Sequence, residues 1–516
     1  MGRELRRRLS DQAELAAIDV FARNLRNLLL QRPLRNTVIL GVDPGFRSGC
    51  KLAAIDTSGR LLKGGVIYPH PPQLRRAEAI ATLREWISRH SVGVVAIGNG
   101  TASRETQEVV AEALASASNL FSHVRMTIVD EAGASVLSVS EKAAAAEPGT
   151  DVGTRGAASL ARRLQDPLAE LVKVNPVSLG VGMYQSDVTP KKLSAELAHV
   201  VQGCVCHVGV ELNSASAELL QHVAGLTAAR ASAVLEARPK GGYKSRKELL
   251  KVKGIGPKSF EQAAGFLRIT GGCEPLDGTA VHPESYDSAR TILRHLGVNT
   301  NALTSGRLSA PQAGAAARDS YSVIRNTAGG DVPATARGKL DSELDALRQD
   351  ASRLSKVAQL AGISVADARQ VIDGLGAAWR DARLELDGPL LLESKLRSLE
   401  DVRTGEILRG VVRNVTPFGA FIDVGLKDDG LVHSSELCDK ARQPDIFSLV
   451  SIGQNVRVRV LAIDLVRRHL KLSMRGLTTY QDSGVEGGMG GTKRPAHPNR
   501  NHVDGEPKHC KQSKLS

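Results

Sequence analysis

Hydrophobic residues change their spacing near residue 36 of the chain. Before that point, an apolar set at helical spacing that includes Phe21, Leu25 and Leu29 predicts one amphipathic helix within residues 1–35. After it, short apolar runs bounded by turn residues predict strands at 38–42, 51–56, 61–68, 92–97 and 124–129, with helices at 74–90 and 105–114. An α/β domain is therefore expected to follow the first helix.

Three strands followed by alternating helices and strands is the order of an RNase H-like sheet, which we assign to residues 36–165. Carboxylates stand at the ends of its strands: Asp43 ends the first strand, and Asp130 and Glu131 follow the last. Nucleases of this kind use several carboxylates to hold two divalent ions roughly 4 Å apart. If the domain is a nuclease, Asp43, Asp130 and Glu131 are its candidate catalytic residues.

Other residues of the same edge favour a domain without catalytic activity. The strand at 92–97 is followed by Asn99, a weak neutral ligand, and the next helix carries Arg155 where a further carboxylate would be needed. A guanidinium there would oppose Mg²⁺ and suit a phosphate. The alternative role for Asp43 is a carboxylate that caps the turn at Pro44. We therefore predict no metal site and no cofactor, with the metal-dependent nuclease kept as the alternative.

Residues 166–286 have a helical pattern that contains a repeat. Leu219–Ala237 and Leu249–Gly265 share one layout at an interval of 29 positions, and the second unit resembles a helix-hairpin-helix with a core at 215–270. Its glycines permit a tight turn whose backbone N–H groups can face a phosphate. The alternative is an ordinary helical turn with solvated lysines. The candidate phosphate-binding residues are Lys251, Lys253, Gly254, Gly256 and Lys258.

Residues 287–400 are predicted to be a flexible linker with helices at 340–360 and 364–378, to which we assign no function. Residues 401–476 then show five short strands separated by turns, the pattern of a small barrel, and this segment resembles an S1 domain of the OB-fold class. The tail, residues 477–516, has the composition of a disordered segment. The fold class is thus a multidomain α+β protein with a C-terminal β-barrel.

The barrel segment carries two of the chain's eight phenylalanines within four residues. OB-fold barrels bind single strands with exposed aromatic rings beside cationic groups. On this pattern the rings of Phe418 and Phe421 lie on the binding face with His433 beside them, and Arg413 and Arg475 supply positive charge. The alternative for either ring, and more so for Phe421 between Ala420 and Ile422, is a place in the barrel core.

Composition agrees with a polyanionic partner. The chain of 516 residues carries a net charge of +13, and six cysteines in that length do not form a disulfide framework. Cys204, Cys206 and His207 have metal-ligand spacing, but a second ligand pair does not follow, so buried thiols are expected. We expect no membrane span and no targeting peptide, and a cytoplasmic location, or a nuclear one in a eukaryote.

Three motifs of the α/β domain are distinctive: Val38-Ile-Leu-Gly-Val-Asp-Pro-Gly-Phe-Arg-Ser-Gly49, Ile97-Gly-Asn-Gly-Thr-Ala-Ser-Arg-Glu105 and Asp130-Glu-Ala-Gly-Ala-Ser135. They resemble the Tex family of bacterial transcription accessory proteins and the related eukaryotic S1 RNA-binding domain proteins. The resemblance implies a YqgF-type domain related to junction resolvases but without nuclease activity. It also implies that the family's N-terminal helical region is missing from this chain.

Two functions from different classes follow. The first is a non-enzymatic nucleic-acid-binding protein, with RNA or single-stranded DNA as its partner and the transcription or translation machinery as a further partner. The second is a Mg²⁺- or Mn²⁺-dependent, structure-selective nuclease that uses Asp43 and Asp130.

Overall fold

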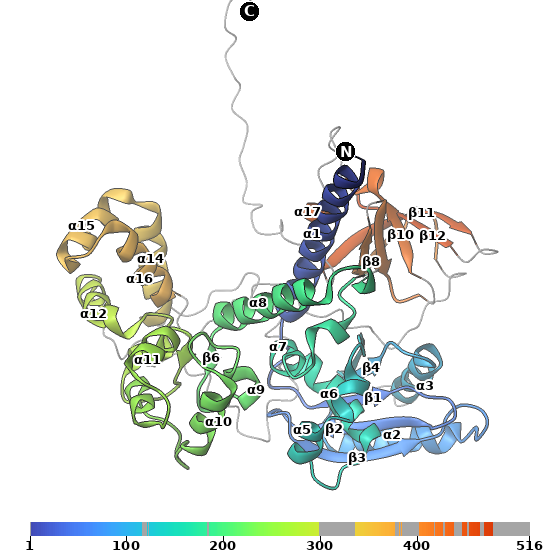
Figure 1. Ribbon diagram of the computed structural model, residues 1–516. Helices are drawn as coiled ribbons and strands as arrows, with labels where there is room; N and C mark the ends of the chain where they lie inside the picture. The colour runs from blue at the N-terminus through green and yellow to red at the C-terminus, as the bar shows by residue number, and fades with distance from the viewer. Residues whose placement is uncertain are drawn as a thin grey trace, which may run out of the picture. The chain divides into compact units, whose positions relative to one another are not determined.

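The structure is a computed structural model. It describes residues 2–115, 121, 123–182, 185–298, 336–376, 381, 383, 402–416, 418–426, 429–437, 446–450, 454–464 and 469–477 (Figure 1). Residues 299–335 of the predicted linker and the predicted tail from residue 478 lie outside the described residues. Among the helices of the described ranges, none has the length and hydropathy that a membrane span requires.

A long helix, α1 (Gly2–Leu29), opens the chain and confirms the predicted amphipathic helix. Its C-terminal half packs on α8 (Pro190–Val208), and Phe21, Leu25 and Leu29 are buried in the shared core. The apolar stripe of α1 is therefore covered by a helix that lies far away in the sequence.

Five strands form one sheet in the order β3–β2–β1–β4–β5, which confirms the predicted RNase H-like arrangement (Figure 1). β1, β2 and β3 pair antiparallel, whereas β1, β4 and β5 pair in parallel. The strands are β1 (Ile39–Asp43), β2 (Cys50–Ile55), β3 (Leu61–Ile67), β4 (Val94–Gly98) and β5 (Arg125–Val129).

Helices cover both faces of this sheet because successive strand residues point to opposite sides. Leu40 and Val42 lie in the core with α2 (Arg76–Arg89) and α3 (Ser103–Ala115), and Ile39 lies in the core with α6 (Val152–Gln165). Helix α6 approaches β1 so closely that a Cβ at Gly41 would overlap the carbonyl of Ala157. The shorter helices of this region are α4 (Ala134–Ser138), α5 (Glu141–Ala146) and α7 (Pro167–Leu171).

Two helical hairpins follow α8. The first consists of α9 (Ala217–Leu220) and α10 (Ala228–Glu236), and the second of the 3-10 helix η3 (Arg246–Lys251) and α11 (Pro257–Ala264). Two short parallel strands, β6 (Val210–Glu211) and β7 (Leu267–Arg268), flank the pair in sequence. Both hairpins contribute to the same core as α1 and α8.

The next described helices share a separate core. They are α12 (Tyr286–His295), α14 (Ala336–Gln349), α15 (Ala351–Ala361) and α16 (Val365–Gly376). The predicted single helix at 340–360 is wrong, because the chain breaks it at Asp350. The carboxylate of Asp350 accepts hydrogen bonds from the backbone N–H groups of Ser352 and Arg353 and so begins a new helix.

A fully buried arginine connects the second hairpin to the segment that leads into this core. The guanidinium of Arg246 donates to the carbonyls of Leu267, Thr279 and Val281 and to the hydroxyl of Tyr286. Arg246 is 0% exposed, so water cannot solvate its charge and these oxygen acceptors replace the lost hydration. The side chain therefore stabilises the packing of the second hairpin against the segment that follows it.

Five strands close into a small barrel in the order β10–β12–β11–β8–β9, which confirms the OB-fold prediction (Figure 1). The strands are β8 (Ile407–Thr416), β9 (Gly419–Asp423), β10 (Gly430–His433), β11 (Asn455–Asp464) and β12 (His469–Ser473), with a short helix α17 (Ile446–Leu449) before β11. Alternate valines of β11 fill the interior, and the intervening residues point outward.

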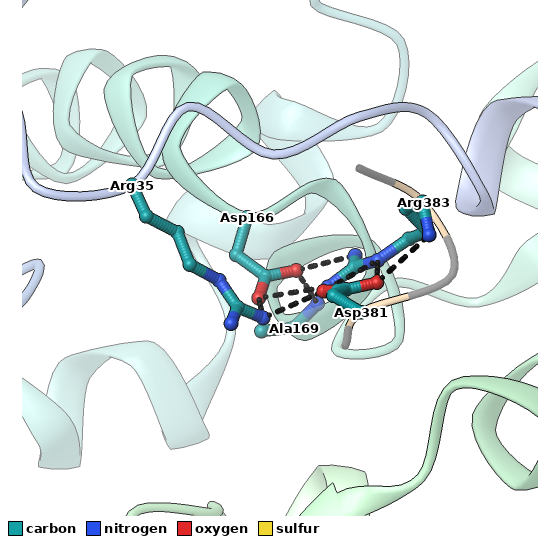
Figure 2. A network of polar contacts seen from close by, with 5 residues as sticks. All are labelled: Arg35, Asp166, Ala169, Asp381 and Arg383. Carbon is teal, nitrogen blue, oxygen red and sulfur yellow. Dashed lines mark hydrogen bonds and ion pairs between the residues drawn. The ribbon is translucent and has the colours of Figure 1, made fainter. Parts of the chain in front are cut away.

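A network of four charged side chains fixes residues 381 and 383 to the junction of α6 and α7 (Figure 2). The guanidinium of Arg383 contacts the carboxylates of Asp166 and Asp381, and Arg35 contacts the same two carboxylates from the other side. Asp166 also caps α7 by accepting from the N–H of Ala169. Burial raises the pKa values of the two carboxyls, but the guanidinium groups outweigh it and hold both below their usual range.

Candidate nucleic-acid interface

The carboxylate edge of the RNase H-like sheet brings Asp43 close to Glu131. Burial and then the negative charge of Glu131 raise the pKa of Asp43 to about 6, against the opposing effect of Lys51. The carboxylate of Glu131 lies against Gly98 and Gly100. A Cβ added at Gly100 would overlap this carboxylate, and a Cβ added at Gly98 would lie 2.9 Å from it. Of the candidate catalytic residues, Glu131 is the one whose charge acts on Asp43.

Asp130 has a different environment. Its carboxylate accepts hydrogen bonds from the side-chain amide of Asn99 and from the backbone N–H of Ala132. The side-chain amide oxygen of Asn99, Oδ1, in turn accepts from the backbone N–H of Glu131. Asn99 therefore stabilises the turn after β5, a role that the sequence analysis did not foresee.

The prediction that Arg155 occupies the position of a further acid is wrong. Its guanidinium donates to the backbone carbonyls of Ser138 and Thr150, which hold it against α4 and the loop before α6. The residue of α6 that faces Asp43 is Gly156, where an added Cβ would lie 3.4 Å from the carboxylate. Helix α6 therefore has a glycine, without a side chain, at the position where a two-metal site would require a carboxylate.

A pair of divalent ions needs several converging carboxylates. At this edge Asp43 and Glu131 converge, Asp130 is held by Asn99, and α6 supplies glycine. Across the described residues, no group of three or more His, Cys, Asp or Glu side chains could hold a metal ion. This donor set does not fit a two-metal site.

The second hairpin presents its turn to solvent. Gly254 has a φ of +88°, a conformation that L side chains rarely adopt, and an added Cβ at Gly256 would meet nothing within 4 Å. Val252 and Ile255 are buried, and the Lys253 side chain between them points outward. The exposed lysines of this turn are Lys251, Lys253 and Lys258.

The first hairpin supports the second. Gly225, which lies 29 positions before Gly254, also has a positive φ of +82°, and an added Cβ there would meet α11. Arg230 of α10 donates to the carbonyls of both Gly225 and Gly254. The two turns are thus connected by one arginine, which sequence reasoning missed because its partners are backbone atoms.

The aromatic pair of the barrel lies on the outer face. Phe418 is 51% exposed, and its ring meets that of Phe421 edge to face at 6.1 Å between centroids. Ala420 and Ile422 are buried on either side of Phe421, so the Phe421 ring points outward and is partly exposed. His433 of β10 pairs with Gly419 of β9 and is exposed beside this pair.

Both predicted cations of this face have carboxylate neighbours. Arg413 lies 3.4 Å from Asp423 and 3.6 Å from Asp429, and Arg475 lies 3.8 Å from Glu436. The sequence analysis missed these carboxylates, because the strand pairing that brings Asp423 to Arg413 is not visible in either strand alone. These carboxylates lower the net positive charge beside the aromatic pair.

Comparison with family models identifies the same units. The model described as the Tex protein YqgF-like domain matches residues 37–165, the helix-hairpin-helix motif matches 205–268, and the S1 RNA binding domain matches 401–475. A further HHH domain model matches residues 274–331, where the sequence analysis assigned no function.

Whole proteins match over most of the chain. "Uncharacterized protein YdcI" of Bacillus subtilis and "Transcriptional accessory protein Tex" of Neisseria gonorrhoeae are both 42% identical, over 92% and 91% of this chain. "Protein YhgF" of Escherichia coli is 40% identical over 95% of it. The chain spans 60%, 56% and 58% of the lengths of these three proteins.

Proposed function

The chain belongs to the Tex family, and from that premise we propose that it is a non-enzymatic nucleic-acid-binding protein that holds single-stranded RNA on its S1 barrel. The observation that carries this proposal is the exposed pair Phe418 and Phe421, whose rings stand outward at an edge-to-face angle of 89°. Stacking of a base on an aromatic side chain contributes ~1–3 kcal/mol to binding, and any of the four bases can stack in this way. Single-stranded DNA can use the same surface.

The second hairpin supplies backbone contacts. Gly254 and Gly256 are exposed, and their backbone N–H groups together with three exposed lysines suit phosphate oxygens, which carry no sequence information. Binding through this turn is therefore expected to be independent of sequence and to weaken as salt rises.

The experiment is a fluorescence anisotropy titration of the whole chain with a labelled single-stranded RNA at fixed salt. Phe418→Ala with Phe421→Ala removes both stacks, which at ~1–3 kcal/mol each predicts a loss of at least about 30-fold. Phe418→Trp keeps an aromatic surface and should retain affinity. Unchanged affinity in the double alanine variant, with the fold intact by circular dichroism, would contradict the proposal.

We infer that the YqgF-like domain does not cleave nucleic acid. The contacts of Asp130 and the glycine of α6 opposite Asp43 support this inference. The test incubates the protein with branched DNA and with RNA in Mg²⁺ and in Mn²⁺, beside an Asp43→Asn variant. Cleavage that requires the metal and is lost in the variant would overturn it; intact substrates in both metals are expected.

A role beside the transcription or translation machinery is part of the same proposal. It is supported by the name of the Neisseria gonorrhoeae relative, a transcriptional accessory protein. Co-purification of RNA polymerase or ribosomes with the tagged chain, before and after nuclease treatment, tests whether such a contact is direct. A cytoplasmic location stays a prediction, which imaging of the tagged chain would check.

A further inference from the structure

The barrel carries a second basic surface, on strands β8, β11 and β12. Val456, Val458 and Val460 of β11 are buried at 1%, 0% and 1% exposure, so Arg457 and Arg459 point outward between them. Both arginines are exposed, and so are Arg409 of β8 and Lys471 of β12. We refer to these four side chains as the β11 surface.

Strand pairing places like charges opposite one another on this surface. Arg457 pairs directly with Arg409 across the antiparallel strands β11 and β8. Directly opposed like charges are unfavourable in a sheet, and the pairing concentrates positive charge at this point of the barrel. Arg457, Arg459 and Lys471 make no ion pair with any carboxylate of the described residues. In this they differ from Arg413 and Arg475, which both have carboxylate neighbours.

The β11 surface is continuous with the aromatic pair around the barrel. Leu431 of β10 pairs with Phe421 of β9 on one side and with Lys471 of β12 on the other. Lys471 pairs in turn with Ala462 of β11, beyond the bulge that follows Val460. Adjacent strands therefore connect the two surfaces across the barrel, from β9 with Phe421 through β10 and β12 to β11, which carries Arg457 and Arg459.

We propose that the β11 surface is a second phosphate-binding site, which holds the backbone of the same single strand beyond the nucleotides stacked on Phe418 and Phe421. The site rests on the proposed function and lies outside the face on which OB-folds usually bind, strands 2 and 3 of the barrel. Arg457 and Arg459 are two residues apart, about 6.6 Å along the strand, so they can contact different phosphates. The proposal predicts an effect that depends on strand length.

The experiment compares two single-stranded RNAs, of about 4 and about 16 nucleotides, the range of site sizes known for OB-folds. Each phosphate contact on a single strand adds about 0.7 to the slope of log K against log salt, equivalent to about fivefold in affinity at 0.1 M salt. Arg457→Gln with Arg459→Gln should therefore weaken binding of the long strand by about 25-fold and lower the slope by about 1.4. Binding of the short strand should not change.

Three controls separate this site from the proposed function. Lys356→Gln with Arg369→Gln makes the same change of net charge on exposed positions of α15 and α16 and should leave both affinities unchanged. Arg457→Lys with Arg459→Lys keeps the charge and should keep the slope. Phe418→Ala with Phe421→Ala should weaken both lengths.

If the long strand binds the double glutamine variant as it binds the wild type, or if the short strand loses affinity equally, the β11 surface is not a second site. If neither strand binds the wild type, the proposed function itself fails.

Discussion

Asp43→Asn is expected to stabilise the RNase H-like sheet at neutral pH, because the native protein holds this carboxylate in an unfavourable environment. Burial and the charge of Glu131 raise its pKa from 3.8 to about 6. Between these two values the folded chain binds the proton more readily than the unfolded chain, so stability falls as pH rises from 4 to 6. Above pH 6 the whole penalty is present, about 3 kcal/mol at about 1.4 kcal/mol per pH unit.

Urea unfolding followed through Trp86 measures this penalty. The chain has two tryptophans, and Trp86 is buried in α2 against the same sheet, so a Trp379→Phe background makes the signal specific for this domain. Asp43→Asn should raise the free energy of unfolding by about 2–3 kcal/mol at pH 7.5 and by almost nothing at pH 4.

Two further variants sharpen the test. Glu131→Gln should stabilise less, and the two changes together should give less than their sum, because each removes part of the same repulsion. Asp130→Asn is the matched control: its carboxylate accepts hydrogen bonds from Asn99 and Ala132, so no gain is expected. A loss of stability in Asp43→Asn at pH 7.5, or a gain of the same size at pH 4, would refute the reasoning.

Three other perturbations give distinct results. Arg383→Met leaves two carboxylates short of a partner and should cost about 3–5 kcal/mol locally, seen as faster hydrogen exchange at the α6–α7 junction. Because the partner carboxyls have lowered pKa values, that difference should begin to shrink as pH falls below about 4 and be lost as pH falls through those lowered pKa values. A difference that does not shrink as the carboxyls are protonated would contradict the ion-pair account. Gly254→Ala should destabilise its hairpin by about 1 kcal/mol or more, because φ is +88° at this position. Gly256→Ala is the matched control and should not destabilise the hairpin. Equal thermal stability of the two variants would argue against the turn geometry. Changing the three exposed hairpin lysines, Lys251, Lys253 and Lys258, to glutamine should lower the salt slope of single-stranded RNA binding by about 0.7 for each lost contact, and an unchanged slope would remove this turn from the interface.

Local patterns were sufficient to predict the main folding units. The strands of the sheet and barrel are short runs of buried aliphatic residues between turn residues, and the hairpin repeat carries its own signal in Gly225 and Gly254. The aromatic pair could also be found, because phenylalanine is scarce in this chain and two occur at one strand start.

Orientation and long-range pairing were not accessible in the same way. Arg155 was expected at the carboxylate edge, but sequence cannot show that carbonyls of Ser138 and Thr150 hold its guanidinium elsewhere. Arg246 likewise looks like one more cation in a basic segment, although its acceptors lie 21 to 40 positions away and bury it completely. Such roles depend on tertiary neighbours rather than on any local spacing.

Crosslinking tests the central claim most directly. The whole chain is irradiated with a single-stranded, uridine-containing RNA, and the crosslinked peptides are identified by mass spectrometry. Contact through the barrel predicts crosslinks at Phe418, Phe421 or His433 that disappear when unlabelled RNA competes. Crosslinks confined to residues 39–165, with none between 407 and 475, would place binding on the RNase H-like domain and contradict the account.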